Sequence, residues 1–284
     1  RCPRDSDSEL TADMDVGFMG SIEPDGCDEI AGVLLQQLGA QGRRYGRESR
    51  RALRGLVSEI YSPPRITTEL RHGRYKYLAP GLAFDITVKD PDDGQPWDFT
   101  RRDKREKARR LIREYKPLLL IGSPMCTAFS TFQNINVSKF KDPEAKQRAY
   151  VQACMHMNFV ASLYWEQLEA GRYFLHEHPR WASSWELKAM KDLKRAPSVD
   201  VVQGDQCQYG AVAPHGPRAG DPVFKPTGFM SNSPEILRQL SRRCTGQGGA
   251  CSRPMGGRHV TCSGSLTAEM AKYPRDLCRA VLKG

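Results

Sequence analysis

The sequence predicts an α/β fold in which a mostly parallel β-sheet is flanked by helices. Short apolar runs typical of buried strands alternate with segments of helical periodicity, and several of these runs end in polar residues. Apolar residues make up 39% of the 284-residue chain, which is enough to fill a core. No apolar run approaches the roughly 20 residues that span a bilayer, so we expect no membrane partner.

The first half of the chain is predicted to alternate helices and strands. Residues 30–60 show helical spacing of apolar side chains with arginines between them, and Pro63 and Pro64 end this helix. The arginines form either a solvated face or, as an alternative, a phosphate-facing one. A strand is expected at 82–88, a brief extended element at 97–99, a basic helix at 103–115 and a buried strand at 118–122.

The second half continues the same alternation. A long helix is expected at 143–170, because apolar residues recur at helical spacing and Gly171 follows as a stop. The remaining expected strands are 172–177, 199–202 and 224–230, and the remaining expected helices are 185–193, 234–240 and 274–282.

Composition divides the chain into three parts. Residues 1–30 are expected to be an acidic, disordered leader, residues 31–78 an arginine-rich helical segment, and residues 79–284 the α/β domain with a basic Cys- and His-containing loop at 241–264. The chain starts without a methionine or an apolar signal segment, from which we expect a fragment of a longer polypeptide.

Charge and cysteine content indicate the surroundings of the protein. The net charge of +10 favours an acidic partner, and nucleic acid is the usual one, although solubility alone is the alternative. The nine cysteines are odd in number and no secretion signal precedes them, so we expect reduced thiols inside the cell.

Three predicted strands end in chemically useful side chains. Asp85, Cys126 and Glu177 would meet at one edge if the strands are parallel. A thiol opposite a carboxyl group suits addition to an electron-poor ring, and a lowered thiol pKa would favour the addition. Alternatively Cys126 is a small buried residue, or it acts with His176 or His178 as a thiol hydrolase or transferase.

The residues around this edge resemble those of the DNA (cytosine-5) methyltransferases. Ser-Pro-Met-Cys-Thr-Ala-Phe-Ser at 123–130 resembles the catalytic loop, and His-Glu-His-Pro at 176–179 resembles the glutamate motif. Further likeness lies in Trp-Asp-Phe at 97–99, Cys-Gln-Tyr-Gly at 207–210, Lys-Pro-Thr-Gly at 225–228 and the closing segment 273–278. The resemblance covers residues 80–284 in the family's order, and it looks closest to uncharacterised domains of retrotransposon-like polyproteins.

The resemblance implies a Rossmann-like fold of the S-adenosylmethionine-dependent methyltransferase type. It implies nuclear methylation of cytosine in nucleic acid, DNA rather than RNA, with Cys126 adding to ring C6 and Glu177 at ring N3. Cofactor contacts are implied at Asp85, Asp98, Phe99, Ser123 and Pro124, and nucleic-acid contacts are expected at Ser130, Lys225, Arg243 and Arg258. The alternatives are a degenerate domain and a non-catalytic nucleic-acid-binding module of such a polyprotein.

A second group of candidate ligands lies in the basic loop. Cys244, Cys251, His259 and Cys262 offer four soft ligands, which can close a tetrahedral zinc site. Their spacing matches no standard zinc finger, so a basic loop with incidental cysteines is the alternative. Either form could contact a phosphate backbone.

Overall fold

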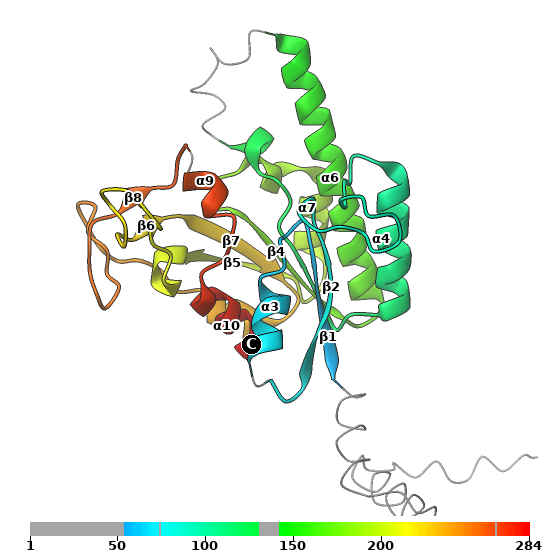
Figure 1. The fold of residues 1–284 in the computed structure, drawn as a ribbon, viewed down its shortest axis with the longest axis horizontal. Helices are drawn as coiled ribbons and strands as arrows, with labels where there is room; N and C mark the ends of the chain where they lie inside the picture. The colour runs from blue at the N-terminus through cyan, green and yellow to red at the C-terminus, as the bar shows by residue number, and fades with distance from the viewer. Residues whose placement is uncertain (1–53, 74, 131–141, 265) are drawn as a thin grey trace, which may run out of the picture. The chain divides into compact units, whose positions relative to one another are not determined.

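The computed structural model describes residues 54–73, 75–130, 142–264 and 266–284 (Figure 1). They belong to one compact unit, Arg54–Gly284. The predicted acidic leader and most of the arginine-rich segment lie outside the described residues.

A six-stranded sheet in the order β2-β1-β3-β4-β7-β5 forms the centre of this unit (Figure 1). Its strands are β1 (Gly55–Ile60), β2 (Leu78–Phe84), β3 (Leu119–Gly122), β4 (Tyr173–Pro179), β5 (Asp200–Asp205) and β7 (Pro226–Ser231). Strands β2, β1, β3 and β4 pair in parallel, whereas β7 is antiparallel to both β4 and β5. The mostly parallel sheet is confirmed, with one reversed strand that the sequence did not indicate. A separate pair, β6 (Val223–Phe224) and β8 (Val260–Thr261), lies outside it.

Helices cover both faces of the sheet. Adjacent strand residues point to opposite faces, and both sets are apolar here, so each face needs a covering layer. On one face Leu120 packs in a cluster with residues of α4 (Arg102–Tyr115), α6 (Pro143–Glu169) and α7 (Lys188–Arg195). On the other face Ile121 packs with residues of α3 (Ile66–His72), α8 (Pro234–Leu240) and α10 (Arg275–Lys283). The remaining short elements are α9 (Leu266–Glu269), η1 (Thr127–Phe129), η3 (Ser183–Glu186) and η4 (Gln206–Tyr209).

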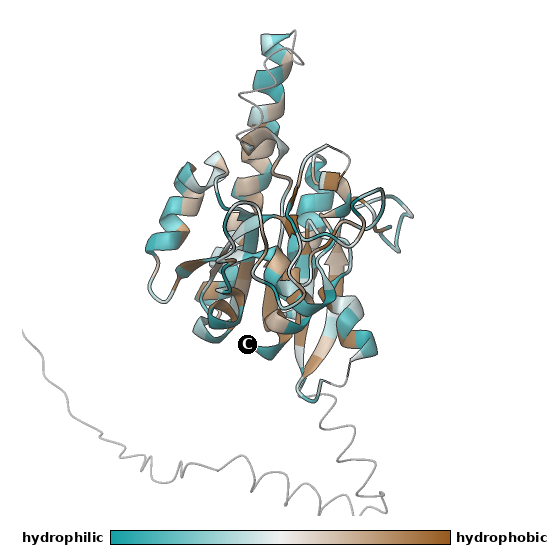
Figure 2. Ribbon diagram, turned by 90° about the vertical axis from the view of Figure 1, so that its left-hand side faces the viewer, coloured by the Kyte–Doolittle hydropathy of each residue, from teal (hydrophilic) through white to brown (hydrophobic). Residues whose placement is uncertain are grey.

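Helix α6 is close to its predicted bounds. Its N-terminus is fixed by Pro143 and by Asp142, whose side chain accepts a hydrogen bond from the Glu144 backbone N–H. The first turns are exposed and hydrophilic, and the helix becomes apolar where it packs on the sheet (Figure 2). Among the described residues, no helix combines the length and the apolar character needed to cross a membrane.

The largest correction concerns residues 54–60, which were expected to be helical. They form β1, a strand between two parallel neighbours. A strand buried on both faces shows no alternation of polar and apolar residues, so the spacing of Leu56, Val57 and Ile60 imitated a helix. Residues 54–78 therefore supply β1 and α3 to the α/β unit instead of a separate helical segment.

Two smaller corrections concern element ends. Strand β2 stops at Phe84, before the predicted end, because Asp85 Oδ1 accepts hydrogen bonds from Thr87 N and Oγ1 and turns the chain. The predicted helix at 185–193 is divided into η3 and α7, and the two meet at Leu187, whose backbone is extended.

Candidate active site

A cleft of about 600 Å³ opens at the carboxyl ends of the parallel strands. Its walls are the segments that follow β1, β2 and β3, the last residues of β4, part of α6, and Lys225 with the region of α9. Strand β1 has β2 as its neighbour on one side and β3 on the other, so the order in which strands are added to the sheet reverses at β1. Such a reversal of strand order is where open α/β sheets bind ligands.

The cleft brings together most of the predicted site residues. Asp85, Asp98, Phe99, Ser123, Pro124, Cys126, Glu177 and Lys225 all line it. Ser130, Arg243 and Arg258 do not line it. Arg243, which is exposed, instead donates to Asp205 at 2.9 Å and to Gln203 at 3.1 Å.

Cys126 lies in the loop after β3, immediately before η1, and is half-buried. Burial raises the pKa of its thiol, Glu177 raises it further, and Lys225 opposes both. The free protein therefore does not have the lowered thiol pKa that would favour addition. The thiol is protonated at neutral pH and needs a base before it can act as a nucleophile.

Glu177 is only 6% exposed and lies near the carboxyl end of β4. Its Oε1 is buried and has no hydrogen-bond partner among the described residues, and the nearest cation, Lys225 Nζ, lies 3.7 Å away. Burial raises the pKa of Glu177, but Lys225 and Arg65 outweigh that effect and hold the pKa below its usual value. An ionised carboxylate oxygen in the cleft is thus left for a ligand.

Arg65 is a functional candidate that the sequence did not reveal. Its side chain is 6% exposed and donates to Ser62 Oγ at 2.8 Å and to Ser123 Oγ at 3.0 Å. The guanidinium lies 3.4 Å from the centre of the Tyr273 ring and also donates to the Ala271 carbonyl. It links the turn after β1, the end of β3 and the segment after α9. A correct assignment of β1 as a strand would have placed Arg65 at this edge.

The turn after β1 is built without glycine. Tyr61 has a φ of 56°, in the left-handed region, and its hydroxyl bonds to His156 Nδ1 at 2.9 Å. The backbone N–H groups of Arg65, Ile66 and Thr67 all donate to the buried carboxylate of Glu59. This turn lies at the reversal of strand order.

The alternative pairing of Cys126 with a histidine is not favoured. Burial lowers the pKa of His178 to about 4 and that of His176 well below its usual value. Each Nδ1 is engaged, by Ser184 Oγ at 2.7 Å and by Tyr164 Oη at 3.2 Å, respectively. His178 lines the cleft, but burial opposes the positive charge that its ring would gain on taking the thiol proton.

The reactivity of Cys126 should report the charge on Glu177. In Glu177→Gln we expect the midpoint of the pH profile for Cys126 alkylation to fall, because the negative charge that raises the thiol pKa is gone. In Lys225→Met the midpoint should rise. Alkylation rates measured by mass spectrometry from pH 7 to 10 test both, with Cys262 read separately because the same charges affect its pKa. Shifts of the same sign in both variants would refute this electrostatic account.

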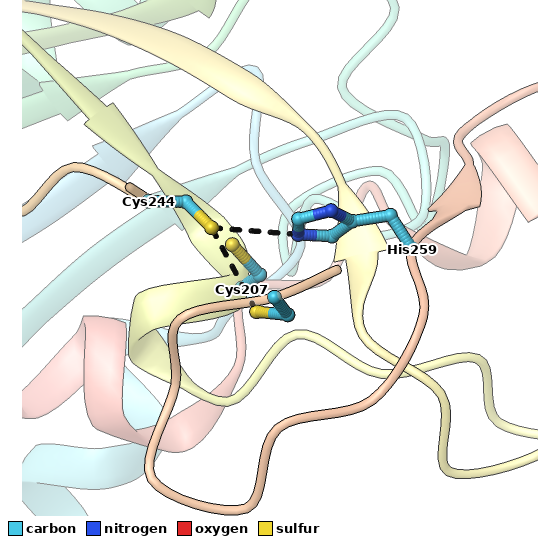
Figure 3. Close-up of side chains that lie close together, drawn as sticks. Cys207, Cys244 and His259 are labelled. Carbon is cyan, nitrogen blue, oxygen red and sulfur yellow. Dashed lines mark hydrogen bonds between the residues drawn. The ribbon is translucent and has the colours of Figure 1, made fainter. Parts of the chain in front are cut away.

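The candidate metal ligands are brought together in part. Cys244, Cys251 and His259 lie close together, but their fourth member is Cys207 of η4 and not Cys262 (Figure 3). Cys262 follows β8 and packs instead against the small apolar cluster of Ala211, Ala213 and Val223. Cys207 was missed because it is far from the basic loop in sequence.

Comparison with known proteins gives little beyond this geometry. No protein-family model matches the chain, and no curated protein matches it. A solved structure of the Entamoeba histolytica methyltransferase EhMeth is similar, with a TM-score of 0.37 and 11% sequence identity. The match covers 64% of this chain and 54% of that one, so it spans about half of that protein.

Proposed function

We propose that this domain acts on nucleic acid as a cytosine-5 methyltransferase-like enzyme. The observation that carries the proposal is Glu177 Oε1, which makes no hydrogen bond within the described residues and belongs to the same cleft as the Cys126 thiol. Nearly all buried polar atoms in proteins are hydrogen-bonded, so an orphaned carboxylate oxygen beside a nucleophile indicates a ligand position. A cytosine ring has an amine to donate to this oxygen and an electron-poor C6 to accept the sulfur.

The two pKa shifts suggest how addition would begin. Before substrate binds, the proton resides on Cys126 and the charge on Glu177. A flipped base would displace water from the cleft, and the thiol proton would pass to Glu177, which would then hydrogen-bond ring N3. As the Cys126 sulfur bonds to C6, the electron pair of the C5–C6 double bond moves to C5. Lys225 would remain near the carboxylate and limit the accumulation of negative charge.

The cleft also suits S-adenosylmethionine, which would supply the methyl group. Asp85 and Asp98 each use Oδ1 in a local turn, and each Oδ2 makes no hydrogen bond within the described residues. Ribose hydroxyls and an adenine amine are donors that fit these oxygens, with Trp97 and Phe99 as apolar neighbours. The N–H groups of the turn already donate to Glu59 and so do not serve the cofactor's carboxylate. The Arg65 guanidinium is the cationic group that would bind this carboxylate instead.

Trapping on 5-fluorocytosine tests the proposal. With S-adenosylmethionine present, we expect a covalent adduct with oligonucleotides containing 5-fluorocytosine, complete loss of the adduct in Cys126→Ala, and its retention in Cys154→Ser. Cys154 is a half-buried thiol of α6 that does not line the cleft. Glu177→Gln should slow adduct formation by about 10²-fold or more. No adduct on DNA or RNA, single- or double-stranded, from folded protein would refute the proposal.

A second candidate is a nucleic-acid-binding domain without catalysis. It is favoured by the turn after β1, whose N–H groups are occupied by Glu59 and so do not serve a cofactor. A rise in Tm with S-adenosylmethionine would favour the enzyme, since a ligand of the folded state stabilises it. Salt-sensitive DNA binding without such a rise would favour the binding domain. An origin in a mobile-element polyprotein and a nuclear location stay predictions.

A further inference from the structure

Four potential metal ligands that do not line the cleft converge at the end of β5. Cys207 comes from η4, directly after β5, and Cys244, Cys251 and His259 come from the basic loop (Figure 3). Their ligand atoms all lie within 4.8 Å of one another. Two segments separated in sequence thus present three thiols and one imidazole to a common centre.

The distances match those of a tetrahedral zinc site. Bond lengths of about 2.3 Å to sulfur and about 2.0 Å to nitrogen place two sulfurs about 3.8 Å apart and a sulfur about 3.5 Å from the nitrogen. Here Cys244 Sγ lies 3.9 Å from Cys251 Sγ and 3.7 Å from His259 Nε2. A disulfide would need about 2.05 Å between sulfurs, and the three cysteines are free thiols.

The surroundings of the cluster fix its ligands in place. Cys207 and Cys251 are 1% and 7% exposed. The Cys244 backbone N–H donates to the buried Asp205 Oδ2 at 2.7 Å, which anchors the start of the basic loop to the end of β5. Cys244 Sγ also accepts from Ser252 N at 3.4 Å, an N–H···S contact of the kind that supports thiolate ligands.

The loop between the ligands is closed by backbone pairing. Cys251 N donates to the Gly257 carbonyl at 2.8 Å, and His259 N donates to the Gly249 carbonyl at 2.7 Å. Gly249 and Gly257 have φ angles of 84° and 101°, which glycine adopts without strain. This tight hairpin brings His259 back to the cysteines, which explains how irregular spacing in sequence still yields a compact ligand set.

We infer that Cys207, Cys244, Cys251 and His259 form a structural zinc site. Three thiolates and an imidazole select zinc over magnesium or calcium, which prefer oxygen ligands. Four protein ligands leave no open position, as in structural rather than catalytic zinc sites. The bound zinc would link the basic loop to the end of β5. This inference does not depend on the proposed function.

Metal content of the purified full chain tests the assignment. We expect about one zinc per chain, lost in Cys207→Ser and His259→Ala and retained in His259→Cys, which restores four ligands. Cys262→Ser is the matched control, because it removes a thiol from the same region without touching the cluster. Zinc-free native protein, or equal zinc loss in Cys262→Ser and Cys207→Ser, would overturn the inference.

A measurement of Tm on the wild-type chain tests the inference even where the variants fail to fold. Chelation of the intact wild-type chain should lower Tm by about 10 °C, and added Zn²⁺ but not Mg²⁺ should restore it. Co²⁺ in place of zinc should give the absorption of a tetrahedral thiolate site. An unchanged Tm after complete zinc removal would rule out a structural role.

Discussion

Replacement of Glu59 by alanine is expected to lower the free energy of unfolding by about 3–5 kcal/mol. The Glu59 carboxylate is fully buried and accepts hydrogen bonds from the backbone N–H groups of Arg65, Ile66 and Thr67, with the shortest at 2.8 Å. It also accepts from the hydroxyls of Ser62 and Thr67. Alanine would leave these donors unpaired at the buried start of α3, where water cannot replace the carboxylate.

Chemical denaturation of the intact chain measures this loss. Glu59→Gln keeps one acceptor oxygen, so it should cost about 1–2 kcal/mol. Glu235→Ala is the matched control, since Glu235 is an acidic residue in the first turn of another helix, α8, but is exposed. Its cost should stay within about 0.5 kcal/mol. A cost for Glu59→Ala no larger than that of Glu235→Ala would show that the carboxylate does not hold the turn.

Replacement of Lys104 by methionine is expected to cost about 3 kcal/mol at pH 7. Lys104 is 1% exposed, and its Nζ lies 2.6 Å from Asp90 Oδ2 and 2.7 Å from Asp93 Oδ2. Asp90 is fully buried and would keep only Lys107, at 2.6 Å, as a cationic partner. Breaking a buried ion cluster is costly because it leaves a charge without compensation.

The cost should depend on pH. Burial raises the pKa of Asp90, but hydrogen bonds from Lys104 and Lys107 outweigh it and hold the pKa at about 2, below its usual 3.8. A depressed pKa stabilises the fold above the unfolded value, and this stabilisation is lost as pH falls toward 2. Loss of Lys104 raises the pKa of Asp90, so the difference between variant and wild type should shrink below about pH 4.

Urea unfolding at pH 7 and at pH 3 measures both parts of this prediction. Asp93→Asn is the control, since Asp93 is the exposed acid of the cluster and should matter less. A constant difference between Lys104→Met and wild type at the two pH values would contradict the electrostatic explanation. The cluster joins α4 to the segment that carries Asp85 and Asp98, so the same variant tests how firmly that wall of the cleft is held.

The sequence predicted the residues that line the cleft better than the strand and turn that position them. Asp85, Cys126 and Glu177 could be assigned to one edge because each follows or ends an apolar run, and parallel strands share their carboxyl ends. Strand β1 could not be recognised, because a strand buried on both faces lacks the alternation that identifies strands. The turn after β1, with Glu59 and Arg65, was missed for the same reason.

Contacts between distant segments were beyond sequence reasoning. Cys207 joins Cys244 only because β5 ends beside the basic loop, where Asp205 binds the Cys244 backbone. Likewise, net charge does not tell which arginines have partners in the fold: Arg243, although exposed, is paired with the buried Asp205. The spacing of residues along the chain reveals neither of these contacts, since both depend on the tertiary fold.

The reversed direction of β7 bears on how such a domain can diversify. Because β7 runs against β4 and β5, its entrance, with Lys225, lies at the same edge as the exits of β3 and β4. The stretch between β5 and β7 can therefore lengthen or shrink during evolution while the strand register stays intact. Under the proposed function, a change in that stretch would alter the contacts to substrate while Cys126 and Glu177 keep their places.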